Sequence, residues 1–235
     1  MKFQNPLKEL SKFEIALWCS SLIIVAASFI LSQSGDILTL IASLTGVTAL
    51  IFVAKGMVFG QVLTVIFAVF YGIISFFFGY YGEMITYLCM TSPIAVLSVI
   101  SWLRHPFQDS SGVEVGKLRT KSKILMIISA LLVTVLFYFI LQYLGNTNLI
   151  ISTVSITTSY LASFLTLMRS PFYAVAYGAN DLILIALWTL ASVENISYVP
   201  MIICFVMFFI NDIYGFVNWQ KMKKIQMLQS QNPLN

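Results

Sequence analysis

Two pairs of neighbouring polar residues lie inside long apolar stretches of the sequence. They are Asn180-Asp181 and Asn211-Asp212. An ionisable side chain in an apolar stretch long enough to cross a membrane is costly, and it usually faces a cavity or a polar partner. Amide and carboxyl groups can hydrogen-bond the hydroxyl groups and ring substituents of a small solute. The two pairs therefore predict a polar binding site between hydrophobic helices.

Helical spacing extends each pair into a stripe of polar and aromatic side chains. Tyr177, Asp181 and Trp188 share one helix face, and Asn211 and Tyr214 share a face of the next helix. Aromatic rings stack on flat solutes and attract cations. The stripes therefore favour a flat, hydroxylated solute that is uncharged or cationic.

A third stripe lies on an earlier apolar segment. It consists of Gln61, Thr64, Ala68, Tyr71 and Ser75. We expect three helices to line one cavity, and the alternative is that these polar residues only bridge helices. The predicted binding residues are Gln61, Tyr71, Tyr177, Asn180, Asp181, Trp188, Asn211, Asp212 and Tyr214.

Composition indicates an integral membrane protein. Of the 235 residues, 59% are hydrophobic and 9% are charged, against roughly 25% charged residues in a soluble domain. A large soluble catalytic domain is therefore excluded. No GxxxxGK[ST], CxxC or HExxH motif occurs, so we expect no ATPase activity, metal, cofactor or enzyme activity. The three cysteines lack paired spacing and are expected to be small core residues.

The apolar stretches form eight segments of about 20 residues, the length that crosses a bilayer. They are 13–31, 37–53, 58–78, 84–103, 124–144, 149–168, 172–191 and 200–217. We therefore expect an all-α fold with about eight transmembrane helices. Pro93, in the fourth segment, either kinks its helix and frees backbone carbonyls or is tolerated there. Tyr80, Tyr81 and Tyr198 are expected in the aromatic belt at the membrane interface.

The basic residues predict the orientation. All 13 Lys and Arg residues lie in the terminal segments and alternate connectors, whereas the other connectors contain Asp36, Glu83 and Glu194. Basic residues stay on the cytoplasmic side, so we expect both termini in the cytoplasm and the protein in the cell (inner) membrane. A cleaved signal peptide at 13–31 is less favoured because this stretch is longer than the apolar region of a typical signal sequence.

An internal repeat is indicated by aromatic residues at a constant offset. An offset of 117 maps Tyr71 onto Trp188, Ser75 onto Ser192 and Trp102 onto Trp219. We interpret residues 36–103 and 146–219 as triple-helix units, joined by a cytoplasmic loop and linker helix at 104–145. Residues 1–35 add an N-terminal segment with an extra helix, and 220–235 form a basic tail. Parallel 3+1+3 repeats are typical of transporters, although aromatic residues can also simply mark membrane interfaces.

The last segment carries a more specific motif. Residues 211–219 read NDIYGFVNW, which resembles the N-x-x-Y-G-x-x-x-W ending of PnuC-type vitamin transporters, whose best-known member carries nicotinamide riboside. The YGE sequence at 81–83, the LW pair at 187–188 and Trp102 resemble further elements of that family. The resemblance covers about residues 37–224, and the first segment is an addition that some members carry.

The resemblance implies a 3+1+3 fold related to the SWEET sugar transporters and a homotrimer. It also implies transport without coupled ions, after which a cytosolic ribosylnicotinamide kinase traps the substrate. The site it implies includes Gln61, Asn180, Trp188, Asn211 and Tyr214. The sequence departs from the family at 173–177, where many members are tryptophan-rich, and at Asp212, where many have serine or asparagine. Thiamine, riboflavin and (deoxy)nucleosides therefore remain alternative substrates.

The leading hypothesis is facilitated diffusion of nicotinamide riboside by alternating access. The expected partners are this small-molecule substrate and the lipid bilayer, and no nucleic acid is expected to bind. One alternative is a proton-coupled symporter in which Asp181 or Asp212 changes protonation. Another is a substrate-capturing subunit that depends on a partner ATPase. An intramembrane enzyme is least favoured, because the sequence lacks a catalytic motif for one.

Overall fold

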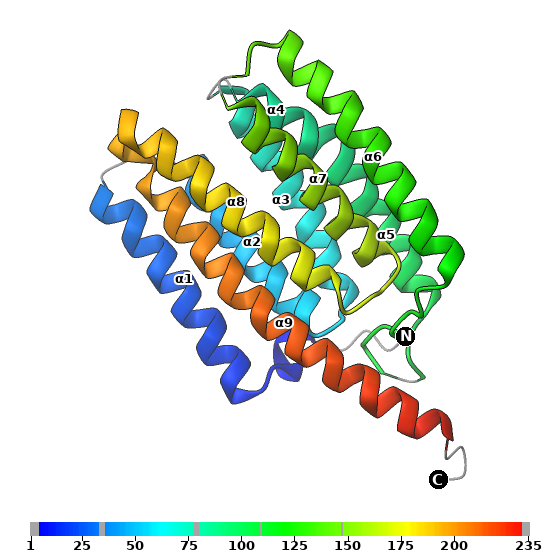
Figure 1. Cartoon of the computed structure of the whole chain (residues 1–235). Coiled ribbons are helices and arrows are strands. Elements are labelled where there is room, and N and C mark those ends of the chain that lie inside the picture. The colour runs from blue at the N-terminus through cyan, green and yellow to red at the C-terminus, as the bar shows by residue number, and fades with distance from the viewer. Residues whose placement is uncertain (1–4, 33–35, 78–79, 109, 147, 232–235) are drawn as a thin grey trace.

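The computed structural model describes residues 5–32, 36–77, 80–108, 110–146 and 148–231. Within these ranges the chain is helical, and its β-structure consists of two isolated bridges, Met57 with Gly112 and Pro106 with Val113. Eight helical segments of the described chain are long and apolar enough to cross a membrane. The expected all-α membrane fold with eight spans is confirmed (Figure 1).

The helices follow the predicted order, with most ends within a few residues of the predicted positions. Their bounds are α1 Lys12–Ser32, α2 Ile37–Ala54, α3 Val58–Phe77, α4 Tyr81–Ile85, α5 Ser92–Arg104, α6 Thr120–Tyr143, α7 Leu149–Leu167, α8 Tyr173–Glu194 and α9 Val199–Gln231. Helix α9 runs well beyond residue 217, where the apolar segment ends. Hydropathy marks the part of a helix that lies in the membrane, whereas the Lys, Gln, Met and Leu residues that follow still favour helix.

The fourth span contains an irregular turn. Helices α4 and α5 are joined by a π-helical turn, η2 Thr86–Thr91, directly before Pro93. Proline has no N–H to donate, and its ring clashes with the carbonyl group four residues earlier, so a wider turn accommodates it. The turn carries Tyr87 and Thr91, both buried in the bundle. Pro93 was predicted either to kink its helix or to be tolerated there, and the structure shows a local irregularity in the form of this π-helical turn.

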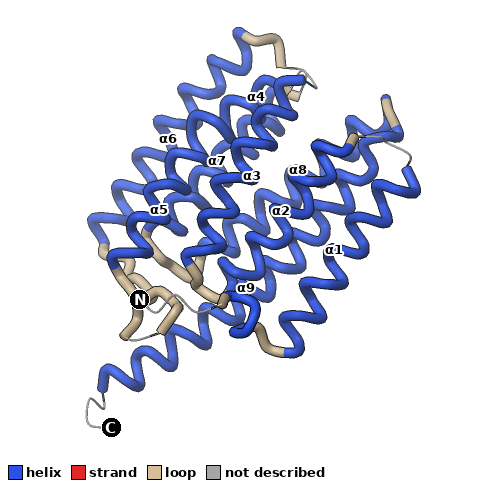
Figure 2. The backbone as a smooth tube through the Cα atoms, turned by 180° about the vertical axis from the view of Figure 1, so that it is seen from behind, coloured by secondary structure: helices blue, strands red, loops and turns tan. Residues whose placement is uncertain are grey.

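Two helices lie on the flanks of the bundle and the others surround its core. In both views α1 packs outside α2 and α9, and α6 packs outside α7 (Figures 1 and 2). In the most apolar stretch of each helix, 17% of the residues of α1 and of α6 are buried inside the protein, compared with 56% for α2 and α7. Cys19 on α1 and Cys89 in η2 are exposed on the outer surface, and only Cys204 is buried. The prediction that all three cysteines are core residues was therefore wrong, because in a membrane protein the outer surface is apolar too.

The two ends of the bundle differ in charge. Every Lys and Arg among the described residues lies at one end, here called the basic end, whereas Lys2 lies outside the described residues. The other end, here called the opposite end, carries Glu83 and Glu194 beside the connectors. At the basic end, the loop 105–119 packs against α9, where Gln226 bonds the backbone of Val113 and Val115 at 3.1 and 2.8 Å. The described part of the connector between α5 and α6 is thus packed against α9.

Candidate functional site

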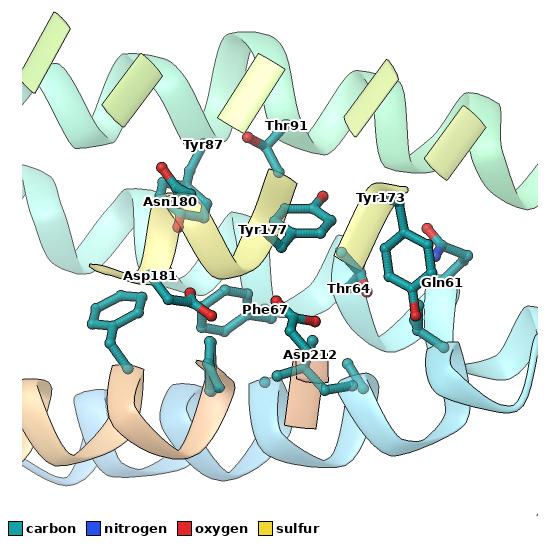
Figure 3. Close-up of a pocket in the computed structure, with 16 residues that line it drawn as sticks. Gln61, Thr64, Phe67, Tyr87, Thr91, Tyr173, Tyr177, Asn180, Asp181 and Asp212 are labelled. Carbon is teal, nitrogen blue, oxygen red and sulfur yellow. The ribbon is translucent and has the colours of Figure 1, made fainter. Parts of the chain in front are cut away.

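A cavity lies in the middle of the bundle between α2, α3, the π-helical turn, α8 and α9 (Figure 3). Its polar lining consists of Gln61, Thr64, Tyr87, Thr91, Tyr173, Tyr177, Asn180, Asp181 and Asp212. Its apolar walls consist of Gly46, Ala49, Leu50, Val53, Phe67, Phe205 and Phe208. The cavity thus combines phenol rings, amides and two carboxyl groups, as expected for a flat solute with many hydrogen-bond donors.

Five of the nine predicted binding residues line this cavity. They are Gln61, Tyr177, Asn180, Asp181 and Asp212. The carboxyl groups of Asp181 on α8 and Asp212 on α9 lie within hydrogen-bonding contact, and each residue is 3% exposed. Both groups point into the same part of the cavity in Figure 3. Two negative charges this close repel each other, so the pair favours a shared proton or a bound cation.

Hydroxyl groups on α7 orient the polar side chains of α8. The Asn180 Oδ1 atom accepts hydrogen bonds from Thr158 Oγ1 at 2.9 Å and from Ser155 Oγ at 3.2 Å. The Tyr177 hydroxyl lies 3.3 Å from Ser163 Oγ. Because the oxygen of Asn180 is held toward α7, its orientation is fixed before any solute enters. Helix α7 was not predicted to contribute to the site, although seven of the residues 152–163 are Ser or Thr.

Several buried oxygen atoms of the cavity have no hydrogen-bond partner within the described part of the chain. They belong to Gln61 (Oε1), Thr91 (Oγ1) and Asp181 (Oδ2). None of the residues that line the cavity is Lys, Arg or His. Buried polar atoms are normally satisfied, so these oxygens are available to accept hydrogen bonds from a solute. The cavity therefore suits a solute that donates hydrogen bonds or carries a positive charge, and it does not suit an anion.

Tyr71 and Trp188 were predicted to line the site, but the structure places them beside the cavity, toward the opposite end. The Trp188 Nε1–H donates a hydrogen bond to the Tyr71 hydroxyl at 3.2 Å. The Tyr71 ring lies 4.4 Å from the ring of Tyr87, which does line the cavity. The rings of Tyr80 and Tyr198 lie 5.0 and 5.6 Å from that of Trp188, and burial raises the pKa of Tyr80 to about 12. Tyr80 and Tyr198 thus pack into one aromatic cluster with Trp188.

Asn211 and Tyr214 face α1 instead of the cavity. The Asn211 amide donates to Ser21 Oγ at 3.1 Å, and the Tyr214 hydroxyl donates to Glu14. Glu14 also forms an ion pair with Lys55, whose Nζ atom lies 3.3 Å from Glu14 Oε1. Successive residues on an α-helix project about 100° apart. Here Asp212 lines the cavity, whereas Asn211 contacts α1.

The cavity also includes residues that the sequence analysis did not select. Tyr87 and Thr91 come from the π-helical turn, and Phe67 and Phe208 form apolar walls. In the sequence, the one indication of this was that Tyr87 and Thr91 lie four residues apart and could therefore share a helix face. Phe67 and Phe208 could not be distinguished from other apolar residues. Tyr173, a further lining residue, belongs to the stretch 173–177 that lacks the tryptophans of the resembled family.

Gly215, in the motif at 211–219, permits a close contact behind the cavity. A Cβ atom at this position would lie 2.9 Å from the Tyr173 hydroxyl oxygen, closer than normal van der Waals contact. The glycine thus lets α9 approach Tyr173, which is 1% exposed. Trp219 at the end of the motif donates to the backbone oxygen of Val53 at 2.9 Å. The motif therefore holds α9 against α2 and α8.

The family of the chain is shown by comparison with known proteins. The family model described as "Nicotinamide mononucleotide transporter" matches residues 36–221. The chain belongs to this family. The match begins after α1 and ends within α9, so it includes six whole spans, α9 as far as residue 221, and the cavity. The protein is accordingly a multi-pass membrane transporter and not an enzyme.

Curated relatives and a solved structure agree with this family. The nicotinamide riboside transporter PnuC of Neisseria mucosa is 23% identical over 214 residues, which cover 89% of this chain and 81% of the relative. The protein of the same name from Haemophilus influenzae is 25% identical over 216 residues and covers 90% and 91%. The crystal structure of the vitamin B3 transporter PnuC matches with a TM-score of 0.79 at 24% identity, over 92% of this chain and 94% of the other. The transporter therefore shares its fold with that structure.

Proposed function

We propose that this transporter carries nicotinamide riboside across the cell membrane. The observation that carries the proposal is the set of unpartnered oxygen atoms on Gln61, Thr91 and Asp181 in a cavity whose lining has no basic side chain. Nicotinamide riboside has a positively charged pyridinium ring, a carboxamide NH₂ and ribose hydroxyl groups, which complement these acceptors. The names of the relatives from Neisseria mucosa and Haemophilus influenzae support the same substrate.

Each group of the substrate has a matching partner in the cavity. The pyridinium ring lies near the carboxyl groups of Asp181 and Asp212 and stacks on Tyr177. Gln61 and Asn180 bind the carboxamide and the ribose hydroxyls. Of the other predicted binding residues, Tyr71 and Trp188 close the cavity toward the opposite end, and Asn211 and Tyr214 hold α9 against α1.

The substrate is the riboside and not its phosphate ester. Buried phosphate groups are bound by Arg, Lys or helix N-termini, whereas the lining residues of this cavity include two carboxyl groups and no basic side chain. A phosphate monoester would bring an additional negative group close to the carboxyl groups of Asp181 and Asp212. We expect nicotinamide mononucleotide to bind at least 100-fold more weakly than the riboside, equal to about 2.8 kcal/mol.

Transport is facilitated diffusion by alternating access between two triple-helix units, 36–103 and 146–219, linked by α6. The protein works as a homotrimer with its basic end and both termini in the cytoplasm, because basic residues remain on that side. A solute that only equilibrates does not accumulate. Accumulation therefore depends on a cytosolic ribosylnicotinamide kinase, whose product the cavity does not accept.

The test is ligand binding and uptake by the purified protein. Calorimetry would compare nicotinamide riboside with thiamine, riboflavin, a deoxynucleoside and nicotinamide mononucleotide. Selective binding of the riboside, together with uptake into liposomes that contain this protein alone, supports the proposal. Tighter binding of another vitamin would show that nicotinamide riboside is not the substrate. An absence of uptake without a partner ATPase would contradict autonomous transport.

Proton-coupled symport is a second candidate, favoured by the contact between Asp181 and Asp212. A carboxyl pair of this kind can hold one shared proton and still keep one negative charge, so a proton and the cationic riboside can be bound together and cross in the same direction. A pH gradient imposed on proteoliposomes would then drive riboside above its external concentration, and Asp181→Asn would abolish that accumulation. Uptake that stops at equal concentrations on both sides would favour facilitated diffusion.

A further inference from the structure

Glu83, outside the cavity lining, is a buried acid whose role the proposed function leaves unexplained. The residue is 4% exposed, and its Oε2 atom has no hydrogen-bond partner among the described residues. A carboxyl group buried in a membrane protein without a partner is costly and usually marks a functional position. The burial of Glu83 therefore requires an explanation.

The side chain points into the bundle, directly beside the cavity. Glu83 lies four residues before Tyr87 and eight before Thr91, so the three share one face of the fourth span. Its carboxyl group is close enough to interact electrostatically with the phenol groups of Tyr71 and Tyr87. The neighbouring Gly82 is buried against α6 instead, since a Cβ there would lie 2.7 Å from a Leu141 side-chain atom.

The charge of Glu83 also has no partner at its own end of the bundle. The ion pair that the structure records among the described residues joins Lys55 to Glu14 at the basic end. Among the described residues, the opposite end has no Lys or Arg. No basic side chain among the described residues at this end can pair with Glu83, and the rings of Tyr71, Tyr87 and Trp188 lie nearby to attract a cation from the solution.

We propose that Glu83 is a specificity-determining residue that receives the positively charged ring of the solute between the opposite end and the cavity. The cation pairs with Glu83 about one helical turn from Tyr87, and then moves to the carboxyl groups of Asp181 and Asp212. The inference rests on the proposed function, because the charged group that pairs with Glu83 is the pyridinium ring of the proposed substrate. It predicts discrimination by charge at this position, before the solute reaches the central cavity.

The test compares a charged and an uncharged form of one solute. Proteoliposomes would take up nicotinamide riboside, which is cationic, or its 1,4-dihydro form, which is neutral and of nearly equal size. In Glu83→Gln, the KM for the cation should rise about tenfold, while the KM for the neutral form should change less than about twofold. Glu194→Gln is the matched control, because Glu194 is an exposed acid at the same end of the bundle, and it should change neither KM.

Three outcomes would overturn the role of Glu83. One is an unchanged ratio of the two KM values in Glu83→Gln. Another is an equal loss with both solutes, which indicates a structural role. The third is an equal change of the ratio in Glu194→Gln, which indicates general attraction by the surface charge. Wild-type protein that transports neither form would instead refute the proposed function itself.

A measurement on the wild-type protein keeps the inference testable if Glu83→Gln does not fold. Dicyclohexylcarbodiimide modifies buried carboxyl groups, and peptide mapping would measure its reaction at Glu83. The cationic riboside should protect Glu83 at least about threefold better than the neutral form at equal occupancy, since only the cation pairs with the carboxylate. Equal reaction of Glu83 in the presence of either form would overturn the inference.

Discussion

Trp188 donates a hydrogen bond to Tyr71 across 3.2 Å, and the two residues stand 117 positions apart in the sequence. A second pair at the same offset, Trp102 and Trp219, has its ring centroids 5.5 Å apart near the basic end. Equivalent positions of two units contact each other only close to the axis that relates the units. The two contacts support the proposed 3+1+3 repeat and suggest where its halves close the cavity at either end.

The first prediction concerns the Tyr71–Trp188 hydrogen bond. Tyr71→Phe should destabilise the protein by about 1 kcal/mol, and Trp188→Phe should cost more because it also loses ring packing. The double variant should lose about 1 kcal/mol less than the sum of the two, because both changes remove the same bond. Thermal unfolding in detergent, monitored with and without riboside, measures this coupling. Losses that simply add would show that the bond does not link the two halves.

The second prediction separates the neighbours Asn211 and Asp212. Asp212→Asn should lower the affinity for nicotinamide riboside at least tenfold, because Asp212 faces the cavity. Asn211→Ala should leave the Kd within about twofold and lower the stability by about 1 kcal/mol, because it loses the bond to Ser21. Calorimetry and thermal unfolding measure the two quantities. The reverse pattern would mean that the cavity lies on the other face of α9.

The third prediction concerns the hydroxyl groups that orient Asn180. Thr158→Val keeps the shape of the side chain but removes the donor 2.9 Å from Asn180 Oδ1, so the affinity for riboside should fall about fivefold. The matched control is Thr157→Val, because Thr157 lies next along α7 and contacts Thr134 of α6 instead. Equal effects of the two variants on the Kd would show that α7 does not orient the site.

The fourth prediction concerns the contact of Gly215 with Tyr173. Gly215→Ala should destabilise the protein by about 1 to 3 kcal/mol, since its methyl group would lie 2.9 Å from the Tyr173 oxygen. Tyr173→Phe removes that oxygen and should restore at least half of the lost stability in the double variant. Unfolding midpoints of the four proteins test this. An absence of rescue would place the strain elsewhere in α9.

The spans could be predicted from the sequence because membrane insertion depends on local hydropathy. Runs of about 20 apolar residues and the polar breaks between them are properties of the chain itself. The polar pairs at 180–181 and 211–212 were visible for the same reason, and Asn180, Asp181 and Asp212 do line one cavity. The family motif at 211–219 was also readable without a structure.

Only the tertiary structure decided which face of each helix meets the cavity. It turned Asp212 toward the cavity and Asn211 toward α1, and it brought Tyr87 and Thr91 inward through the π-helical turn before Pro93. The reason is the solvent. In water, an apolar face marks the side of a helix that is buried, but in a membrane the lipid is as apolar as the protein core. Hydrophobic periodicity therefore cannot assign the inner face, and the packing of neighbouring helices must do so.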